Sequence, residues 1–279
     1  MSVVIAIDAG TTGVRAGAFG ADGLPMGYRY QEFTQHFPRP GWVEHDANEI
    51  WDTTVGVLRA LIDDLSQPVA AIGITNQRET VVAWDRTTSE PLHRAIVWQD
   101  RRTAARCQEL EASGHLALIR RRTGLVLDPY FSGTKLGWLF GEGGVPSGPD
   151  VAVGTIDSWL LWKLTGGAVH ATEPTNASRT MLFDIEALAW SDELCELLGV
   201  PSHVLPEVLP TSGRFGTTAG GDGLPPGIPI SGIAGDQQAA LFGHACFDVG
   251  DTKNSYGTGS FVLMNIGPDM PEPVEGLLT

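Results

Sequence analysis

The sequence predicts an α/β fold with a mixed β-sheet flanked by helices. Short apolar runs rich in β-branched residues, typical of buried strands, recur along the chain. Amphipathic helical stripes alternate with these runs, which is the pattern of α/β proteins. The first strands follow one another with no helix between them, and such an opening hairpin argues against a Rossmann or P-loop unit.

Three strands are expected before the first helix. The apolar run at 3–7 (VVIAI) predicts a buried strand, and a polar, glycine-bearing segment at 8–13 (DAGTTG) follows it. Residues 14–19 predict a second strand, and the turn residues at 21–23 (ADG) lead into a third.

The first helix is expected to begin near Asp46, with Glu49 three residues later completing a capping-box-like start. An apolar stripe from Ile50 to Leu65 keeps the helical period. The Gly- and Pro-rich segment 213–227 is the expected internal boundary. The remaining elements are strands expected at 69–74, 81–84, 151–155, 228–233, 251–256 and 261–266, and helices expected at 158–164, after Ser191 and at 236–243.

Composition and charge narrow the class of protein. Hydrophobic residues make up 42% of the 279 residues and charged residues 18%, which indicates a globular protein. The formal charge, 18 − 33 = −15, argues against binding nucleic acid or an anionic membrane surface. The same charge would repel a bare nucleotide triphosphate, so a phosphate site would need its own local donors and a metal ion.

No apolar run approaches the length of a membrane span, and the N-terminus lacks the basic stretch and long apolar core of a signal peptide. The three cysteines, Cys107, Cys195 and Cys246, lie far apart and in no metal-ligand spacing. We therefore expect buried free thiols in a cytoplasmic protein. The last residues, 275–279 (EGLLT), are typical of the beginning of a strand, so we expect a truncated chain.

The segment after the first strand has the residue types of a phosphate site. Gly10 lets the backbone approach an oxyanion, and the hydroxyls of Thr11 and Thr12 can donate to phosphate oxygens. Asp8 is placed to hold Mg²⁺ through water, and Arg15 is the nearest cation that could reach a transferring phosphoryl group. The alternative is an ordinary Gly-Thr hairpin turn.

A second turn of this kind, Gly257-Thr258-Gly259, lies between two expected strands near the other end of the chain. Alone it is a weaker signal than the first turn. The pair is more informative, because two such loops can hold one triphosphate from opposite sides.

Eight sequence blocks are long and unusual: DAGTT at 8–12, PGWVEHD at 40–46, GITNQRET at 73–80, AIVWQDRRT at 95–103, TGLVLDPYFSGTK at 123–135, TNASRTMLF at 175–183, ISGIAGDQQAALFG at 230–243 and YGTGSF at 256–261. With these blocks the chain resembles the FGGY carbohydrate kinases, and among them the glycerol-type kinases. Members that act on xylulose or similar substrates carry a different sequence where this chain has 76–79, which sharpens the glycerol-type resemblance.

The resemblance implies an actin-like ATPase (ribonuclease H-like) fold. Residues 1–250 would be the first domain, with the polyol site, and 251–279 the beginning of a second domain, most of which would be absent here. ATP and Mg²⁺ are the implied cofactors, and the implied reaction transfers the terminal phosphoryl group of MgATP to a primary hydroxyl of a small polyol, glycerol giving glycerol 3-phosphate. The resemblance also allows a homo-oligomer, a dimer or a tetramer.

The resemblance further assigns site residues position by position. Asp236 would be the catalytic base that accepts the proton of the attacking hydroxyl. A triol needs mixed donors and acceptors with aromatic walls, and the neighbours Arg78 and Glu79 are expected to offset each other's desolvation. The implied polyol residues are Arg78, Glu79, Tyr130, Asp236 and Gln237, with Trp98 and Phe261 packing against the carbon backbone. The implied phosphate residues are Gly10, Thr11, Thr12, Arg15, Thr258 and Gly259, and the implied metal ligand is Asp8.

Each of these assignments has a simpler alternative. Arg78 and Glu79 alone would fit a solvated surface ion pair, and Asp236 would fit a helix N-cap. Trp98 and Phe261 would fit core aromatic residues near strand ends.

The chain departs from the glycerol-type pattern at three places. Ala9 stands where Gln is common, which is expected to remove a polar group beside the phosphates, and Asp100 stands where Cys is common, which is expected to be neutral. Regulated members bind fructose 1,6-bisphosphate at a loop that corresponds to 220–227. Here that segment has an added acid and no cation, so we expect no inhibition by this bisphosphate. Residues 213–227 also contain no histidine that could serve as a phosphorylation switch.

Three functions stay open from the sequence. The first is a kinase for glycerol or for another polyol or sugar. The second is a polyol-binding module without turnover, because the adenosine half is expected to be absent. The third is an actin-like ATPase or scaffold that hydrolyses ATP without an acceptor, against which the set of Arg78, Glu79 and Tyr130 argues.

Overall fold

The computed structural model describes residues 2–257 and 259–279 of the chain. Its centre is a six-stranded sheet with the strand order β13-β14-β5-β1-β2-β3. The neighbours β1, β5 and β14 are parallel, whereas β2, β3 and β13 pair antiparallel, so the sheet is mixed as predicted. These strands are β1 (Val3–Ala9), β2 (Gly13–Phe19), β3 (Pro25–Glu32), β5 (Val69–Asn76), β13 (Ser212–Thr217) and β14 (Pro229–Gly235).

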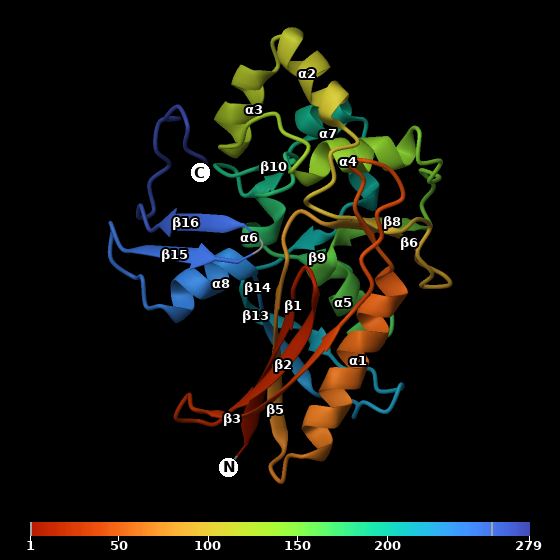
Figure 1. Cartoon of the computed structure of the whole chain (residues 1–279), viewed down its shortest axis with the longest axis vertical. Helices are drawn as coiled ribbons and strands as arrows, with labels where there is room; N and C mark the ends of the chain where they lie inside the picture. Colours follow the sequence, from red (N-terminus) through yellow and green to blue (C-terminus); the bar gives the residue numbers. More distant parts are fainter. Residues whose placement is uncertain (1, 258) are drawn as a thin grey trace.

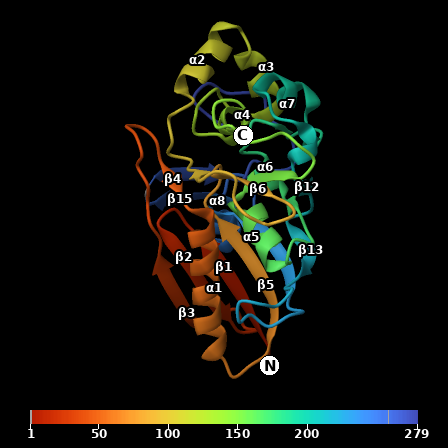
Figure 2. The same ribbon diagram turned by 90° about the vertical axis from the view of Figure 1, so that its right-hand side faces the viewer.

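Two helices, α1 (Ala47–Asp63) and α5 (Ile156–Leu164), cover one face of this sheet (Figure 2). Ile5 and Ile7 of β1 are fully buried in the core on this side. Because side chains alternate along a strand, Asp8 points to the opposite face of the sheet. The predicted opening hairpin of β1 and β2 is confirmed.

Helix α1 begins where the sequence predicted. The carboxylate of Asp46 accepts hydrogen bonds from the backbone N–H groups of Asn48 (2.9 Å) and Glu49 (3.3 Å). The second half of the predicted capping box is wrong, since the Glu49 carboxylate instead accepts from the backbone N–H and hydroxyl of Thr34. The Glu49 side chain therefore ties α1 to the segment after β3.

A second core lies above the large sheet in Figure 1. A four-stranded sheet with the order β4-β7-β6-β8 forms its floor, and short helices surround it (Figure 1). These elements are β4 (Glu44–His45), β6 (Val81–Asp85), β7 (Ala95–Ile96), β8 (Val151–Thr155), α2 (Ala104–Ala112), α3 (Leu116–Thr123), α4 (Ser132–Phe140) and α7 (Asp192–Leu198).

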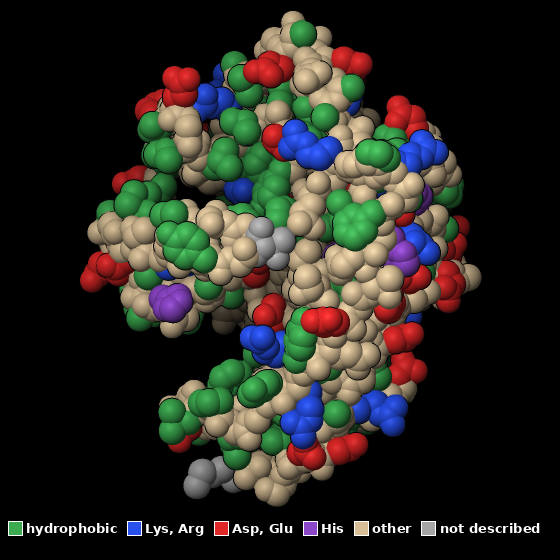
Figure 3. All heavy atoms as spheres, in the orientation of Figure 1, with side chains coloured by type: hydrophobic (Ala, Val, Ile, Leu, Met, Phe, Trp, Pro, Cys, Tyr) green, Lys and Arg blue, Asp and Glu red, His purple; other side chains and the backbone are tan. Residues whose placement is uncertain are grey.

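The C-terminal unit consists of α8 (Asp236–Gly243) and a hairpin of β15 (Thr252–Tyr256) and β16 (Ser260–Met264). It projects from the body of the molecule, and hydrophobic side chains lie on its surface (Figure 3). The exposed residues of this unit include Phe242, Phe247 and Val262. The remaining short elements are β9 (Ala171–Thr172), α6 (Pro174–Ala177), β10 (Phe183–Asp184), β11 (Ala189–Trp190), η1 (Ser202–Val204) and β12 (Glu207–Val208).

The predicted internal boundary at 213–227 is wrong. Residues 213–217 belong to β13, the edge strand of the central sheet, and the rest of the region connects β13 to its antiparallel neighbour β14. Glycine and proline are enriched there because the connection turns repeatedly, with positive φ at Gly220, Gly221, Gly223 and Gly227.

Asp100, which was expected to be a neutral change, takes part in a buried ion pair, and its neutrality stays a prediction. Asp100 is fully buried and accepts hydrogen bonds from the Val43 N–H (2.7 Å) and from Nε and Nη2 of Arg102 (2.9 and 2.8 Å). The Arg102 guanidinium carbon lies 3.8 Å from the ring centroid of Trp42 and 4.6 Å from that of Trp138. Asp100 therefore carries the countercharge of a buried arginine.

Cys107 and Cys195 are free and buried, as predicted, whereas Cys246 is free but half-buried. Burial raises the pKa of the Cys195 thiol to about 11. No helix in the described parts of the chain is long and apolar enough to cross a membrane.

Candidate active site

A cleft of about 260 Å³ lies where the carboxyl ends of β1, β5 and β14 meet. Parallel strands end at the same edge of a sheet, so Asp8 of β1, Gln77 after β5 and Asp236 after β14 come together there. The β15–β16 turn and the aromatic residues Trp98 and Tyr130 complete the lining. The lining residues are Asp8, Gly10, Thr11, Gln77, Arg78, Glu79, Trp98, Tyr130, Asp236, Gln237, Ser255, Tyr256, Gly257, Gly259 and Phe261.

The turn between β1 and β2 forms one wall of the cleft. The Gly10 N–H donates to the Gly13 carbonyl oxygen (3.0 Å), which closes the turn. Nε2 of Gln77 donates to the Gly10 carbonyl oxygen (2.9 Å), and Nε1 of Trp98 donates to Oγ1 of Thr11 (2.9 Å). Nε2 of Gln35 also donates to the Thr11 carbonyl oxygen (2.9 Å), so three side chains fix the turn, while the Thr11 hydroxyl can still donate its own O–H.

Asp8 stands at the carboxyl end of β1, directly opposite Arg15 in the hairpin register. Burial raises the pKa of Asp8, the nearby Asp236 carboxylate raises it further, and Arg15 lowers it. The two carboxylates therefore repel each other across the cleft. A cation between them would relieve this repulsion.

The chain makes a tight turn at Glu79 on the cleft wall. The φ of Glu79 is +62°, and the Thr80 N–H donates to the Arg78 carbonyl oxygen (2.8 Å), which closes a γ-turn. A positive φ is costly for a residue with a side chain, and such strain concentrates at functional sites. The hydroxyl of Ser132 holds the turn by donating to the Glu79 carbonyl oxygen (3.1 Å).

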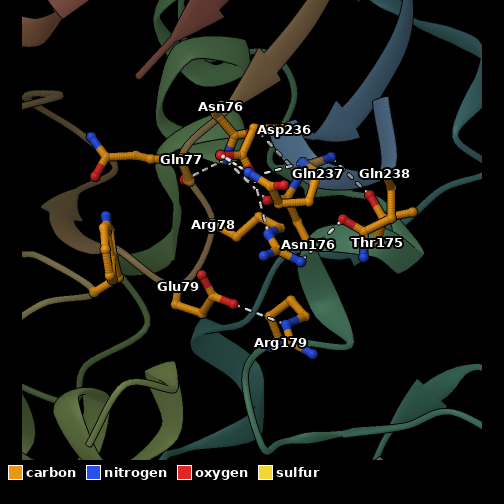
Figure 4. Close-up of polar contacts among 12 residues, drawn as sticks. Asn76, Gln77, Arg78, Glu79, Thr175, Asn176, Arg179, Asp236, Gln237 and Gln238 are labelled. Atoms are coloured by element: carbon orange, nitrogen blue, oxygen red, sulfur yellow. Dashed lines mark hydrogen bonds and ion pairs between the residues drawn. The ribbon is translucent and has the colours of Figure 1, made fainter. Parts of the chain in front are cut away.

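Arg78 and Glu79 are buried, with 5% and 1% exposure, so they are not a solvated surface pair. Their direct partners also differ from the expected ones (Figure 4). Nε of Arg78 lies 3.1 Å from Oδ1 of Asp236, and Nε of Arg179 donates to Oε1 of Glu79 (2.9 Å). Burial alone lowers the pKa of Arg78, but the carboxylates of Glu79 and Asp236 outweigh it and raise that pKa.

Asp236 is the first residue of α8, and Gly235 occupies the N-cap position, so the N-cap alternative for Asp236 is not supported. Its carboxylate accepts from the backbone N–H (2.7 Å) and the side-chain Nε2 (3.2 Å) of Gln237. Burial raises the pKa of Asp236, while Arg78 and Gln237 lower it. Nζ of Lys253 donates to Oε1 of Gln237, which fixes the direction of the Gln237 amide.

Three aromatic rings form the apolar wall. The ring centroid of Trp98 lies 5.5 Å from that of Tyr130 and 6.2 Å from that of Phe261. All three line the cleft and are partly exposed, so Trp98 and Phe261 are not simply core residues. Their faces provide an apolar surface next to the charged groups, which suits a small ligand with a carbon backbone and several hydroxyls.

A buried lysine holds the loop that carries Tyr130. Nζ of Lys135 on α4 donates to the carbonyl oxygens of Pro129 (3.0 Å) and Tyr130 (2.6 Å). Burial lowers the pKa of Lys135 to about 7. Burial also raises the pKa of Tyr130, so its phenol stays protonated and can donate a hydrogen bond.

The model for the N-terminal domain of the FGGY family of carbohydrate kinases matches residues 3–243, most of the chain. The chain belongs to the FGGY family. It is 54% identical to a glycerol kinase of Dechloromonas aromatica, over 99% of this chain and 56% of that protein. It is 50% identical to a glycerol kinase of Rhodospirillum rubrum, over 100% of this chain and 58% of that protein. The FGGY chain thus spans about half the length of the curated relatives it matches.

Solved structures confirm the predicted α/β, actin-like fold of this FGGY chain. A crystal structure of Plasmodium falciparum glycerol kinase with ADP matches with a TM-score of 0.87 and 35% identity, over 95% of this chain and 54% of that chain. A xylulose kinase of Rhodospirillum rubrum matches with a TM-score of 0.85 and 24% identity, over 93% of this chain and 54% of that chain. The second likeness concerns the fold alone.

The FGGY chain brings most of the predicted site residues to one cleft. Thr12 and Arg15 lie on the β1–β2 hairpin but outside the lining of the described residues, and Arg15 lies over the Tyr30 ring at 5.7 Å. Thr258 lies outside the described residues. The predicted residues that line the cleft are Asp8, Gly10, Thr11, Arg78, Glu79, Trp98, Tyr130, Asp236, Gln237, Gly259 and Phe261.

Several contributors were not singled out from the sequence. Gln77, Arg179 and Lys253 each fix a group of the cleft, and two of them lie in blocks that carry the resemblance, at 73–80 and 175–183. The only sequence signal for Arg179 was its place in the second of these blocks, because its partner Glu79 is distant in sequence.

Two interpretations of the positions at which the chain departs from the glycerol-type pattern need correction. Ala9 is fully buried in the hydrophobic core, so its side chain does not lie beside the cleft. In the 220–227 segment, a Cβ atom at Gly223 would lie 2.6 Å from Nε of Arg59, so helix α1 places a cation against this loop. Insensitivity to fructose 1,6-bisphosphate stays a prediction. The argument that no cation near the loop could neutralise a phosphate no longer supports it, because Arg59 lies there.

Proposed function

We propose that this chain supplies the polyol-binding and phosphate-binding half of an ATP-dependent kinase that phosphorylates a primary hydroxyl of glycerol. The observation that carries the proposal is the shared cleft, which is lined both by Asp236 and by Gly10 and Thr11 of the β1–β2 turn. Arg78 and Glu79 supply a donor and an acceptor for hydroxyls, and the aromatic wall suits a short carbon chain. The similarity to glycerol kinases over the whole chain supports glycerol as the acceptor.

The proposed step is an in-line displacement. Asp236 accepts the proton of the attacking hydroxyl, the hydroxyl oxygen forms a bond to the terminal phosphorus of ATP, and the bond from that phosphorus to the bridging oxygen breaks to leave ADP. The Arg78–Asp236 ion pair holds the carboxylate in place. Its raised pKa makes Asp236 a better proton acceptor than an ordinary surface carboxylate.

Magnesium would arrive with ATP as part of the substrate. Among the described residues, no group of three or more His, Cys, Asp and Glu side chains is arranged to hold a metal ion. Mg²⁺ keeps several waters and uses phosphate oxygens, so one or two carboxylates suffice. Asp8, whose pKa is raised by burial and by the nearby Asp236 carboxylate, fits that requirement.

The test is a panel of glycerol, xylulose, erythritol and dihydroxyacetone, measured for binding to this chain and for phosphorylation with MgATP. Binding and phosphorylation of glycerol above the other compounds support the kinase. Glycerol binding without turnover supports a polyol-binding module, and ATP hydrolysis that does not depend on glycerol supports an ATPase. A chain that binds none of the four polyols contradicts the proposal.

A further inference from the structure

The segment 173–179, which contains α6, lies behind the cleft and contributes no side chain to the lining of the described residues. It is nevertheless buried and polar, with Glu173 and Asn176 fully inaccessible and Arg179 9% exposed. Buried polar side chains are retained where their hydrogen bonds hold something in place. Figure 4 shows that side chains of this segment reach the residues that line the cleft.

The closest connection runs from Arg179 to Glu79. Nε of Arg179 donates to Oε1 of Glu79 at 2.9 Å, and the guanidinium carbon lies 5.0 Å from the ring centroid of Phe131. Among the described residues, the Glu79 carboxylate accepts a hydrogen bond only at Oε1, from Arg179. The other oxygen, Oε2, is left for a ligand in the cleft that Glu79 lines.

The segment that carries Arg179 is itself fixed against the end of β5. The side chains of Asn76 and Asn176 exchange two hydrogen bonds, at 3.0 and 3.2 Å. Glu173 caps α6 by accepting from the backbone N–H groups of Thr175 and Asn176. Arg179 is therefore held at a set position relative to the γ-turn at Glu79.

We propose that Arg179 is a positioning residue for the acceptor site, which holds Oε1 of Glu79 so that Oε2 accepts a hydrogen bond from one hydroxyl of the bound polyol. The inference rests on the proposed function, since it needs a polyol in the cleft. Without Arg179, the buried Glu79 would lack its countercharge and could rotate or recruit water. Glu79 would then no longer discriminate a ligand that has this hydroxyl from one that lacks it.

The test measures calorimetric binding of glycerol, 1,2-propanediol and 1,3-propanediol to this chain. At least one diol lacks the hydroxyl that Glu79 contacts and is expected to bind the wild type more weakly than glycerol. The variant Glu79→Gln shows which diol this is, because the ratio of the glycerol affinity to the affinity for that diol decreases in the variant. Arg179→Met is expected to weaken glycerol binding about tenfold or more and to reduce discrimination against the same diol.

The matched control is Arg122→Met, which removes an arginine paired with Asp184 and Glu193 away from the cleft. It should leave all three affinities within about twofold of the wild type. If Arg179→Met fails to fold, the double variant Glu79→Gln/Arg179→Met, which buries no unpaired charge, and Arg179→Lys take its place. The double variant should bind glycerol at most about twofold more weakly than Glu79→Gln does.

The outcomes separate the two proposals. A wild-type chain that binds no polyol overturns the proposed function, and the role of Arg179 falls with it. A wild-type chain that binds glycerol, with unchanged discrimination between glycerol and the diols in the Arg179 variants, overturns the positioning role alone. Loss of affinity for glycerol and both diols by the same factor also overturns it, because that is the effect of a merely structural residue.

Discussion

Nε1 of Trp98 donates a hydrogen bond to Oγ1 of Thr11 at 2.9 Å, which joins the aromatic wall of the cleft to the proposed phosphate turn. The Trp98 side chain thus belongs both to the proposed polyol site and to the proposed phosphate site. The indole face is available to the carbon chain of a polyol, while its N–H fixes the threonine whose own O–H can donate to a phosphate oxygen.

Trp98→Phe keeps most of the apolar surface and removes this hydrogen bond. In the complete kinase of which this chain is proposed to be one half, we expect MgATP-dependent phosphorylation of glycerol to fall by about fivefold, the value of one hydrogen bond of roughly 1 kcal/mol, with a smaller effect on glycerol binding. Thr11→Val removes the same contact from the other side. Its effect combined with Trp98→Phe should be less than additive, and additive effects would show that the contact is not used.

Asp236→Asn removes the proposed base with little change in shape. In the complete kinase of which this chain is proposed to be one half, turnover with glycerol and MgATP should fall by at least about 10²-fold, while the calorimetric affinity for glycerol changes little. The matched control is Asp269→Asn at an exposed position outside the cleft. Near-normal turnover in Asp236→Asn would refute the assignment of the base.

Gly235→Ala tests whether the position of Arg78 matters. A Cβ atom at Gly235 would lie 2.6 Å from Cδ and 2.8 Å from Cγ of Arg78, so the arginine has to move. We expect glycerol affinity to fall by about tenfold, because a charged hydrogen-bond donor is displaced. Gly232→Ala in the same strand is the control, since its Cβ would meet only an ordinary contact at 3.7 Å, and equal losses in both variants would count against the prediction.

His45 predicts a loss of stability in acid. Burial, with a smaller effect of His36, lowers the pKa of His45 to about 3, below its ordinary value of 6.5. Between these values the unfolded chain binds the proton and the folded chain does not. Above pH 6.5 the neutral His45 therefore does not lower the free energy of unfolding. As the pH falls from 6.5 toward 3, the free energy of unfolding decreases by at most about 1.4 kcal/mol per pH unit.

Urea denaturation at about pH 7 and pH 4.5 checks this, because His45→Gln should lose less stability on acidification than the wild type. His203→Gln, at an exposed position, is the control and should follow the wild type. Equal acid sensitivity of His45→Gln and the wild type would contradict the prediction.

Two neighbouring arginines allow a direct comparison of a buried and an exposed ion pair. The Arg102 side chain is 1% exposed and pairs with Asp100 and Glu44, whereas the Arg101 side chain is 57% exposed and pairs with Asp128. Arg102→Gln should lower the free energy of unfolding by about 3 kcal/mol, because it leaves buried carboxylates unpaired. Arg101→Gln should change it by less than about 1 kcal/mol, and similar losses in urea denaturation would show that burial is not decisive.

Much of the fold could be predicted from local patterns. The opening strands, the Asp46 cap and the hairpin near the other end of the chain all depend on residues close together in the sequence. The segment 213–227 was misread because glycine and proline are common both in linkers and in connections between paired strands. A linker between domains and a connection between paired strands are distinguished here only by the pairing of β13 with β14, which is a tertiary contact.

The site residues followed from the family resemblance, but their partners did not. Adjacent residues of opposite charge suggested an Arg78–Glu79 pair, yet the γ-turn gives each of them a distant partner, Asp236 and Arg179. The burial of Asp100 could not be predicted for the same reason, since its neighbours in sequence do not reveal that it is fully inaccessible. Pairing in three dimensions decides what a charged residue does.

The backbone at position 79 adopts a conformation that favours glycine, while the cleft uses a carboxylate there. Glycine would relieve the backbone at this position, but it would also leave the buried guanidinium of Arg179 without its carboxylate. The fold therefore retains the strained Glu79 for its own ion pair, and a variant selected only for heat resistance is expected to keep the carboxylate even where no polyol is present.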